Sequence, residues 1–243
     1  MAKKSRSTAK KKKPSRKRSG GFRARLRTWW RRGLLGLALL LVVVIVLPSF
    51  LPVPQGFYMR SEARRLGDIQ RVWVPMDEIA PMMARSVVAA EDANFCNHWG
   101  FDMSAIRDAI EDGGNRGAST LSQQVVKNVY LWQGRNWTRK ALEALMTPLV
   151  EAAWSKRRIV EVYLNVAEFD EGIFGVEAAA RTYFGTTPED LTAREAALLA
   201  ALLPNPKERD AANPSQFVAR RASQIADGAA TIARDGRAAC FED

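Results

Sequence analysis

Two adjacent acids and the sole histidine of the chain lie in one short stretch, "EDANFCNHWG", at residues 91–100. Glu91 and Asp92 directly follow the apolar run 86–90, and His98 comes six residues after Asp92. A carboxylate beside apolar side chains has a raised pKa, which suits a general base near neutral pH. By itself, however, the pattern is more typical of a helix that ends in acids at the water surface and of a structural histidine.

A second stretch, "GASTLSQQVVKN", places a hydroxyl, an amide and an ammonium at helical spacing. Thr120, Gln124 and Lys127 are related as i, i+4 and i+7, which predicts that they share one helix face. A helix start that carries donors and a cation favours an anion such as phosphate. A solvated polar face explains this stretch equally well.

A third stretch, "RNWTRKALEAL", places Arg139 and Glu143 four residues apart, with Lys140 beside them. For this stretch alone, a surface ion pair worth roughly 0.2–0.5 kcal/mol is the simpler explanation.

Helical patterns position all three stretches. Apolar residues recur at helical spacing, and Thr192 with Glu195 has the spacing of a capping box. Strand-like runs are few, so residues 60–237 are predicted to form one mostly α domain. The expected helices cover residues 82–90, 103–112, 119–131, 137–155, 156–168, 175–185, 192–206 and, as the last helices, 213–236.

The formal charge of +11 comes from the start of the chain. Residues 1–32 hold 15 Lys and Arg and no acid, which leaves 22 basic and 26 acidic residues in the rest. A block of like charges predicts a disordered tail that binds polyanions. Because the rest of the chain is slightly acidic, the composition argues against a nucleic-acid partner.

The segment Gly33–Val53 has no charged residue and spans about 30 Å as a helix, the thickness of a bilayer core. Trp29 and Trp30 on one side, and Phe57 and Tyr58 on the other, are placed like interfacial aromatics. The preceding basic residues predict a cytoplasmic N-terminus, a tail on anionic membrane lipids and an extracytoplasmic domain. A cleaved signal peptide is the alternative, but no A-x-A site follows the apolar run.

Cys96 and Cys240 are the two cysteines of the chain. Outside the cytoplasm a disulfide between them is compatible with the sequence, but their spacing does not establish one. The simpler expectation is a buried Cys96 and an unpaired Cys240. No Cys/His cluster with metal-ligand spacing occurs in the sequence.

Taken together and in order, these stretches resemble the bacterial peptidoglycan glycosyltransferases of family 51. "EDANFCNHWG" matches E-D-x-x-F-x-x-H-x-G, and "RKALE" matches R-K-x-x-E. "GASTLSQQVVKN" is close to G-x-S-T-L-T-Q-Q-x-x-K-N, with Ser122 in place of Thr. "IVEVYLN" with "GIFGVEAAARTYFG", and then "EAALLAALLPNP", supply two further motifs, so the resemblance covers about residues 70–215.

The resemblance implies a lysozyme-like glycosyltransferase domain that polymerises lipid II into β-1,4-linked strands and releases undecaprenyl pyrophosphate. Only 37 residues follow the fifth motif, which predicts a monofunctional enzyme without a transpeptidase domain. Lipid II, the nascent glycan strand and membrane lipids are the implied partners, with other cell-wall synthases or division proteins as further candidates. The implied location is the bacterial inner membrane.

The resemblance also assigns roles to residues. Glu91 matches the general base and Glu143 the second catalytic glutamate. We expect Asp92, Phe95 and His98 to shape the first motif and orient Glu91. Glu143 would hold the cations in place or coordinate a divalent cation, Mg²⁺ or Mn²⁺, on the donor pyrophosphate. The other expected substrate-binding residues are Ser119, Thr120, Gln124, Lys127, Asn128, Arg139 and Lys140.

Two other functions fit part of this pattern. A lysozyme-like wall-cleaving enzyme shares the fold and the first glutamate, but it has no use for Lys127, Arg139 and Glu143 as a pyrophosphate site. A non-catalytic scaffold for cell-wall assembly need not keep both glutamates. The complete set of motifs therefore favours the polymerase.

Overall fold

The structure is a computed structural model that describes residues 20–113, 117–134 and 136–242. The chain divides into two units, of which the second begins at Ile45. Much of the predicted basic tail, residues 1–19, lies outside the described residues.

The first unit contains most of α1 (Gly20–Val46), an apolar helix that is consistent with a membrane anchor. Its segment Ala24–Ser49 is long and apolar enough to cross a bilayer. The predicted anchor, 33–53, runs past the end of this helix. The α-helix ends at Val46 and a 3₁₀ turn containing Pro48 follows, since proline has no N–H to continue the helix.

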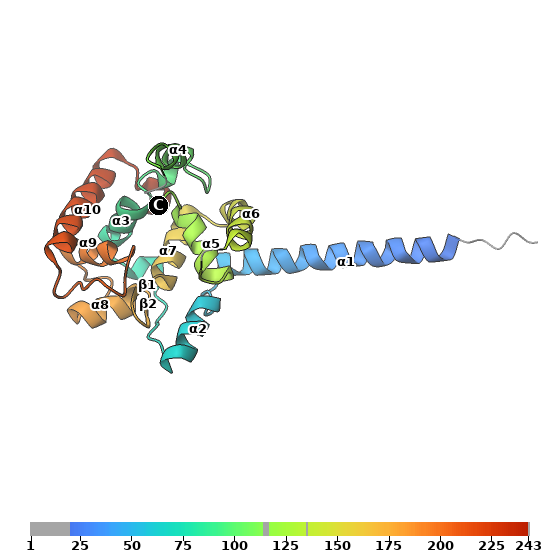
Figure 1. Cartoon of the computed structure of the whole chain (residues 1–243), viewed down its shortest axis with the longest axis horizontal. Coiled ribbons are helices and arrows are strands. Elements are labelled where there is room, and N and C mark those ends of the chain that lie inside the picture. Colours follow the sequence, from blue (N-terminus) through green and yellow to red (C-terminus); the bar gives the residue numbers. More distant parts are fainter. Residues whose placement is uncertain (1–19, 114–116, 135, 243) are drawn as a thin grey trace, which may run out of the picture. The chain divides into compact units, whose positions relative to one another are not determined.

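The second unit is mostly helical, as predicted (Figure 1). Its α-helices are α2 (Phe57–Leu66), α3 (Pro81–Glu91), α4 (Met103–Glu111), α5 (Leu121–Tyr130), α6 (Trp137–Ala153), α7 (Lys156–Val166), α8 (Val176–Phe184), α9 (Ala193–Leu202), α10 (Gln216–Asp235) and α11 (Ala239–Glu242). Its 3₁₀ turns are η1 (Leu47–Ser49), η2 (Met76–Glu78) and η3 (Phe95–Asn97). Strands β1 (Glu168–Asp170) and β2 (Ile173–Phe174) pair antiparallel, with Glu168 opposite Phe174.

Two groups of helices build the core. Helices α3, α9 and α10 pack against one another, and α5 packs against both α6 and α7 (Figure 1). Small side chains on α9 allow its close packing, because Ala196, Ala197, Ala200 and Ala201 are at most 1% exposed. The first motif begins at the end of α3 and the second runs into α5, and the Asp92 carboxylate links the two groups by accepting the backbone N–H of Leu121.

Side chains of the domain bind backbone carbonyls at Ile45 and at Val53. The Trp154 indole donates to the Ile45 carbonyl over 2.7 Å, and Arg71 donates to the Val53 carbonyl over 2.6 Å. Val53 is 2% exposed, so its apolar side chain packs in the protein core and not in lipid.

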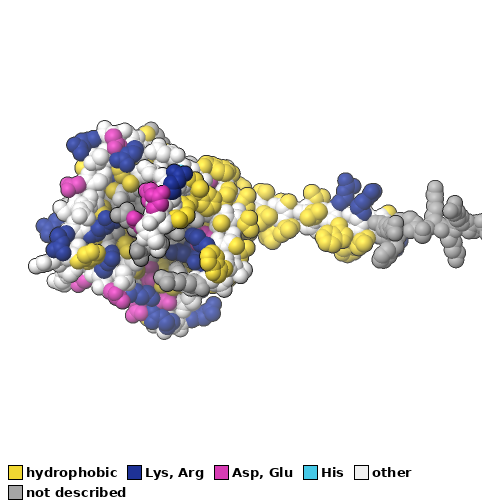
Figure 2. Space-filling model, turned by 45° about the horizontal axis from the view of Figure 1, so that its top comes forward, with side chains coloured by type: hydrophobic (Ala, Val, Ile, Leu, Met, Phe, Trp, Pro, Cys, Tyr) yellow, Lys and Arg dark blue, Asp and Glu magenta, His cyan; other side chains and the backbone are white. Residues whose placement is uncertain are grey.

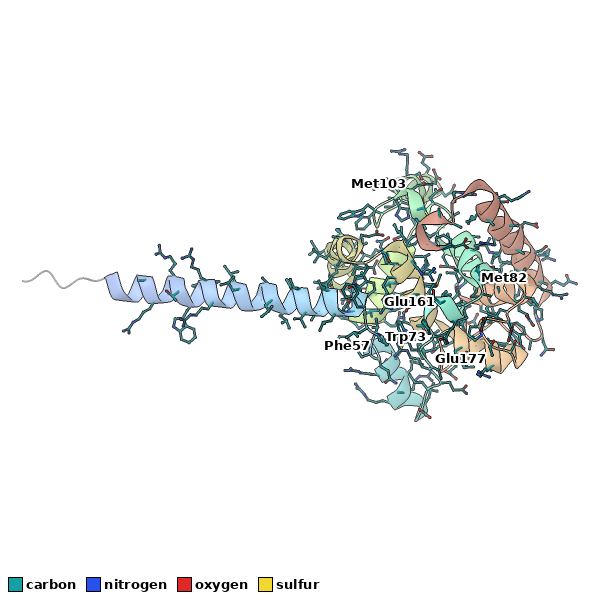
Figure 3. All side chains as sticks on the ribbon, turned by 180° about the vertical axis from the view of Figure 1, so that it is seen from behind. Phe57, Trp73, Met82, Met103, Glu161 and Glu177 are labelled. Atoms are coloured by element: carbon teal, nitrogen blue, oxygen red, sulfur yellow. A yellow bond between two sulfur atoms is a disulfide. The ribbon has the colours of Figure 1, made fainter. Side chains whose placement is uncertain are left out.

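Arg158 makes a similar bond to the carbonyl of Pro48, over 2.8 Å. Its guanidinium lies 5.0 Å from the centre of the Trp73 ring and pairs with Glu161. Figure 3 labels Trp73 and Glu161, which appear near each other in that view.

Three details differ from the sequence expectations. Helix α2 was not expected, and it contains Tyr58, whose ring contacts Phe174 edge-on at 5.7 Å, so this side chain packs against the domain. Residues 216–235 form one helix where more than one was expected. Cys96 and Cys240 form a disulfide, so the expectation of an unpaired Cys240 is wrong. The two cysteines meet because α11 packs against η3.

Candidate active site

Glu91 is the last residue of α3, at the point where the helix meets the loop of the first motif. The Gln124 amide, from α5, donates to Glu91 Oε2 over 2.8 Å. The Tyr163 hydroxyl, from α7, donates in turn to Gln124 Oε1 over 3.3 Å. Two neutral side chains from two helices therefore orient the Glu91 carboxylate.

The surroundings of Glu91 make it a stronger base than an exposed glutamate. Burial raises the pKa of its carboxyl above the ordinary value, and the bond from Gln124 and the charges of Arg221 and Lys127 oppose this shift only in part. A carboxylate with a raised pKa accepts a proton more readily near neutral pH, which is the property that a general base needs.

Asp92, Phe95 and His98 form the frame of the first motif. Asp92 is 7% exposed; its Oδ1 lies 2.9 Å from His98 Nε2, and its Oδ2 accepts the backbone N–H of Leu121 over 2.9 Å. Phe95 is fully buried, and the Lys156 ammonium lies 4.2 Å from its ring centre. These residues join the motif to the starts of α5 and α7, so they position Glu91 from inside the protein.

Gly100 closes the same motif in a conformation that requires glycine. Its φ is +83°, and a Cβ at this position would lie 2.7 Å from the Thr147 side chain. The carbonyl of Gly100 accepts the Thr120 hydroxyl over 2.7 Å.

The Thr120 hydroxyl is bonded within the protein and does not share the exposed helix face predicted from helical spacing. Thr120 is the N-cap of α5 and is 3% exposed, and it forms a capping box with Gln123. Its side chain therefore holds the start of α5. Ser119, the preceding residue, is exposed and accepts the Lys140 ammonium over 3.2 Å.

Glu143 is the centre of a cation cluster. It is 2% exposed on α6; Arg139 Nη1 donates to its Oε2 over 2.8 Å, and Lys140 donates to its Oε1. Both oxygens are therefore occupied by cations. Over the described ranges, no group of three or more His, Cys, Asp or Glu side chains could hold a metal ion.

Lys127 is a partly buried cation between the two glutamates. Among the described residues, no side chain hydrogen-bonds to its ammonium, although Glu143 and Glu91 attract it. Burial lowers the pKa of Lys127 below its ordinary value, and these two acids oppose the shift in part. A desolvated ammonium without a direct partner is suited to bind an anion.

Two cavities adjoin the hydrogen-bonded pair of Glu91 and Gln124. One, of about 410 Å³, is lined by Gln124, Lys127 and Asn128 from α5 and by Tyr163. The other, of about 240 Å³, is lined by Glu91 itself and by residues 117–120. The carboxylate thus borders one cavity and is bonded to Gln124, which borders the other.

Sequence reasoning missed two residues of the larger cavity. Lys207 follows directly after the fifth motif, and its ammonium lies 2.9 Å from Glu62 and 3.6 Å from Glu168. Tyr163 is part of the fourth motif, but its position in the sequence does not indicate which way its hydroxyl points. A cation immediately after "LLPNP" was the only available signal for Lys207.

Known proteins share these features across most of the chain. The chain is 63% identical to a biosynthetic peptidoglycan transglycosylase of Jannaschia sp. (strain CCS1), over 89% of this chain and 90% of that protein. It is 50% identical to proteins of the same name from Rhodospirillum centenum, over 86% of this chain and 93% of that protein, and from Yersinia pestis, over 81% and 87%.

The sequence pattern of the transglycosylase family matches residues 60–230, which include both glutamates, the cation cluster and Lys207. This match confirms the resemblance drawn from the motifs, and the chain belongs to the transglycosylase family as a peptidoglycan glycosyltransferase.

Proposed function

We propose that the chain polymerises lipid II by direct displacement, with Glu91 as the general base. The 4-hydroxyl of the acceptor lipid II attacks the anomeric carbon of the growing strand, and its proton passes to Glu91. The bond from that carbon to the pyrophosphate oxygen breaks, and undecaprenyl pyrophosphate leaves with inversion. The carboxylate held by Gln124 beside the unpartnered Lys127 is the observation that carries this proposal.

Besides a base, the reaction needs positive charge that stabilises the departing pyrophosphate, and the cations supply it. Lys127 has no hydrogen-bonding side chain among the described residues, and Arg139 and Lys140 lie next to it on Glu143. We assign Glu143 the task of holding these two cations, since both of its oxygens are bonded to them. A wall-cleaving enzyme would have no pyrophosphate for this cluster to bind, so the cluster favours synthesis.

A polymerisation assay tests the proposal. Purified full-length protein in detergent should convert lipid II into long glycan strands that a wall-cleaving muramidase digests. Release of undecaprenyl pyrophosphate should match the number of bonds formed. Digestion of preformed glycan by the protein, without strand synthesis, would identify a wall-cleaving enzyme, and inactivity in both assays would support a scaffold.

We propose that a divalent cation, Mg²⁺ or Mn²⁺, enters the site bound to the pyrophosphate of the substrate and does not bind to the protein beforehand. The Glu143 oxygens are occupied, and the described residues form no metal cage. We expect that EDTA will raise the KM for lipid II, that Mg²⁺ will reverse this, and that Mg²⁺ will leave the Tm of the substrate-free protein unchanged. A ligand that binds only the folded protein raises its Tm, so a clear increase would contradict this prediction.

We also propose that α1 anchors the chain in the inner membrane with its N-terminus in the cytoplasm, which the basic residues before the apolar segment support. On α6, Trp137 is 90% exposed and Leu145 70% exposed, with Leu142 and Leu149 on neighbouring turns. Figure 2 shows apolar side chains gathered over this part of the domain. Such a surface supports contact with lipid. Protein partners stay a prediction.

A further inference from the structure

The last described helix is covalently joined to the first motif. Cys240 of α11 forms a disulfide with Cys96 of η3, five residues after Glu91. Phe241, next to it, is fully buried, with its ring centre 6.5 Å from that of Phe95. The fixed positions of the family pattern E-D-x-x-F-x-x-H-x-G do not include Cys96, so this bond is an addition to the motif.

Polar contacts reinforce the covalent bond. Glu242 accepts two hydrogen bonds from Arg85, one of them over 2.8 Å, and Arg85 lies on α3 six residues before Glu91. The two side chains are 28% and 24% exposed, so water screens this ion pair only in part. The Glu242 carbonyl also accepts a bond from Arg157, at the start of α7, over 2.9 Å.

Arginines from the same end of the chain bind the backbone on both sides of Glu91. Arg221 donates to the Ala90 carbonyl over 3.2 Å, and Arg237 donates to the Ala93 carbonyl over 3.1 Å. Between Asp92 and His98 the motif has only one short 3₁₀ turn of its own, and Ala93, Asn94 and Asn97 are exposed. Contacts from outside the motif are therefore needed to fix its geometry.

We propose that Arg237, Cys240, Phe241 and Glu242 form a C-terminal latch that positions Glu91 for proton transfer, with the Cys96–Cys240 disulfide as its covalent link. The inference rests on the proposed function of Glu91 as the base. The latch contacts the helix before Glu91 and the loop after it, and none of its residues lines either cavity beside Glu91. It should therefore control kcat and have little effect on substrate binding.

The double variant Cys96→Ser/Cys240→Ser removes the link with little change in side-chain size. We expect its kcat for lipid II to fall about tenfold, since small displacements of a catalytic group are costly, while KM changes less than about twofold. A looser loop exposes Glu91 to water, so the acidic limb of the pH–rate profile should move to lower pH. Both readouts are measured well below the Tm of the variant.

Loss of the disulfide also lowers stability, because it closes a loop with a sequence separation of 144 residues. Leu191→Ala, which truncates a buried side chain just before α9, is the matched control. This variant should lower the Tm and leave kcat and the acidic limb unchanged. If the serine variant loses Tm but keeps its kcat and acidic limb, the latch is only structural and the inference is wrong.

Charge exchange gives a second test that does not involve the cysteines. Arg85→Glu and Glu242→Arg should each lower kcat, and the double variant should recover part of the loss because the pair is restored in reverse. Absence of recovery, together with unchanged kcat in the serine variant, would overturn the inference. If the wild-type protein does not polymerise lipid II at all, the proposed function itself is wrong. That result differs from the variant results above, which test only the latch.

Discussion

Glu91→Gln is expected to lower the rate of lipid II polymerisation by about 10²- to 10⁴-fold, the usual contribution of a general base. Glutamine keeps the size of the side chain and its oxygen can still accept the bond from Gln124, so the geometry of the site is retained. The variant loses only the ability to take the proton of the acceptor hydroxyl. Single-turnover rates with saturating lipid II measure this loss directly.

The pH dependence of the wild-type protein gives a second measurement of the same group. Because burial raises the pKa of Glu91, the rate should rise with pH through a midpoint above ~4.3, the ordinary glutamate value. Because burial lowers the pKa of Lys127, an alkaline limb should appear below ~10.4, the ordinary lysine value. The rising limb from Glu91 and the falling limb from Lys127 together give a bell-shaped pH–rate profile.

The stability of Glu91→Gln shows whether a lower rate comes from the missing base or from a damaged fold. The pKa of Glu91 is higher in the folded protein than in the unfolded chain, so its ionisation costs stability at pH values above ~4.3. Glutamine removes this cost, and the Tm of Glu91→Gln at neutral pH should be no lower than that of the wild type. Glu111→Gln, at the exposed end of α4, is the matched control and should keep full activity. A rate for Glu91→Gln within about threefold of the wild type would exclude Glu91 as the base.

Local sequence signals predicted most of the helices because their causes are local. Thr192 and Glu195 form the expected capping box at the start of α9, and Gly185 ends α8 in the left-handed conformation. The grouping of Glu91 with the cations, in contrast, came from the order of the motifs. Each motif alone had a simpler structural explanation, since residue types do not show which helices pack together.

The wrong expectations have physical causes that a sequence does not contain. Helical spacing placed Thr120 on the face of Lys127, but an N-cap residue has an extended backbone, here with φ −73° and ψ 166°, so the helical period does not apply to it. Hydropathy extended the anchor to Val53 because an apolar side chain in a protein core resembles one in lipid. The pairing of Cys96 with Cys240 depends on tertiary packing that brings α11 to η3.

Lys127→Met is expected to show the second large effect, a fall in rate of about 10²- to 10³-fold, comparable to the loss of one donor that stabilises transition-state charge. Methionine has a similar length and apolar character, so it fills the space without the charge. The KM for lipid II should rise as well, since the pyrophosphate is charged before the reaction and not only in the transition state. Steady-state kinetics with lipid II as the sole substrate separate the two effects.

The same substitution should stabilise the protein, which identifies the charge as a functional requirement. The pKa of Lys127 is lower in the folded protein than in the unfolded chain, so its charged form costs stability at neutral pH. Lys127→Met should therefore have an equal or higher Tm and a much lower rate, and Lys127→Arg should retain more of the rate because it keeps the charge. Arg107→Met, on the exposed face of α4, removes a basic residue without either effect. Equal rates for Lys127→Met and Lys127→Arg would show that the charge of Lys127 has no part in the displacement, because these two variants differ mainly in that charge.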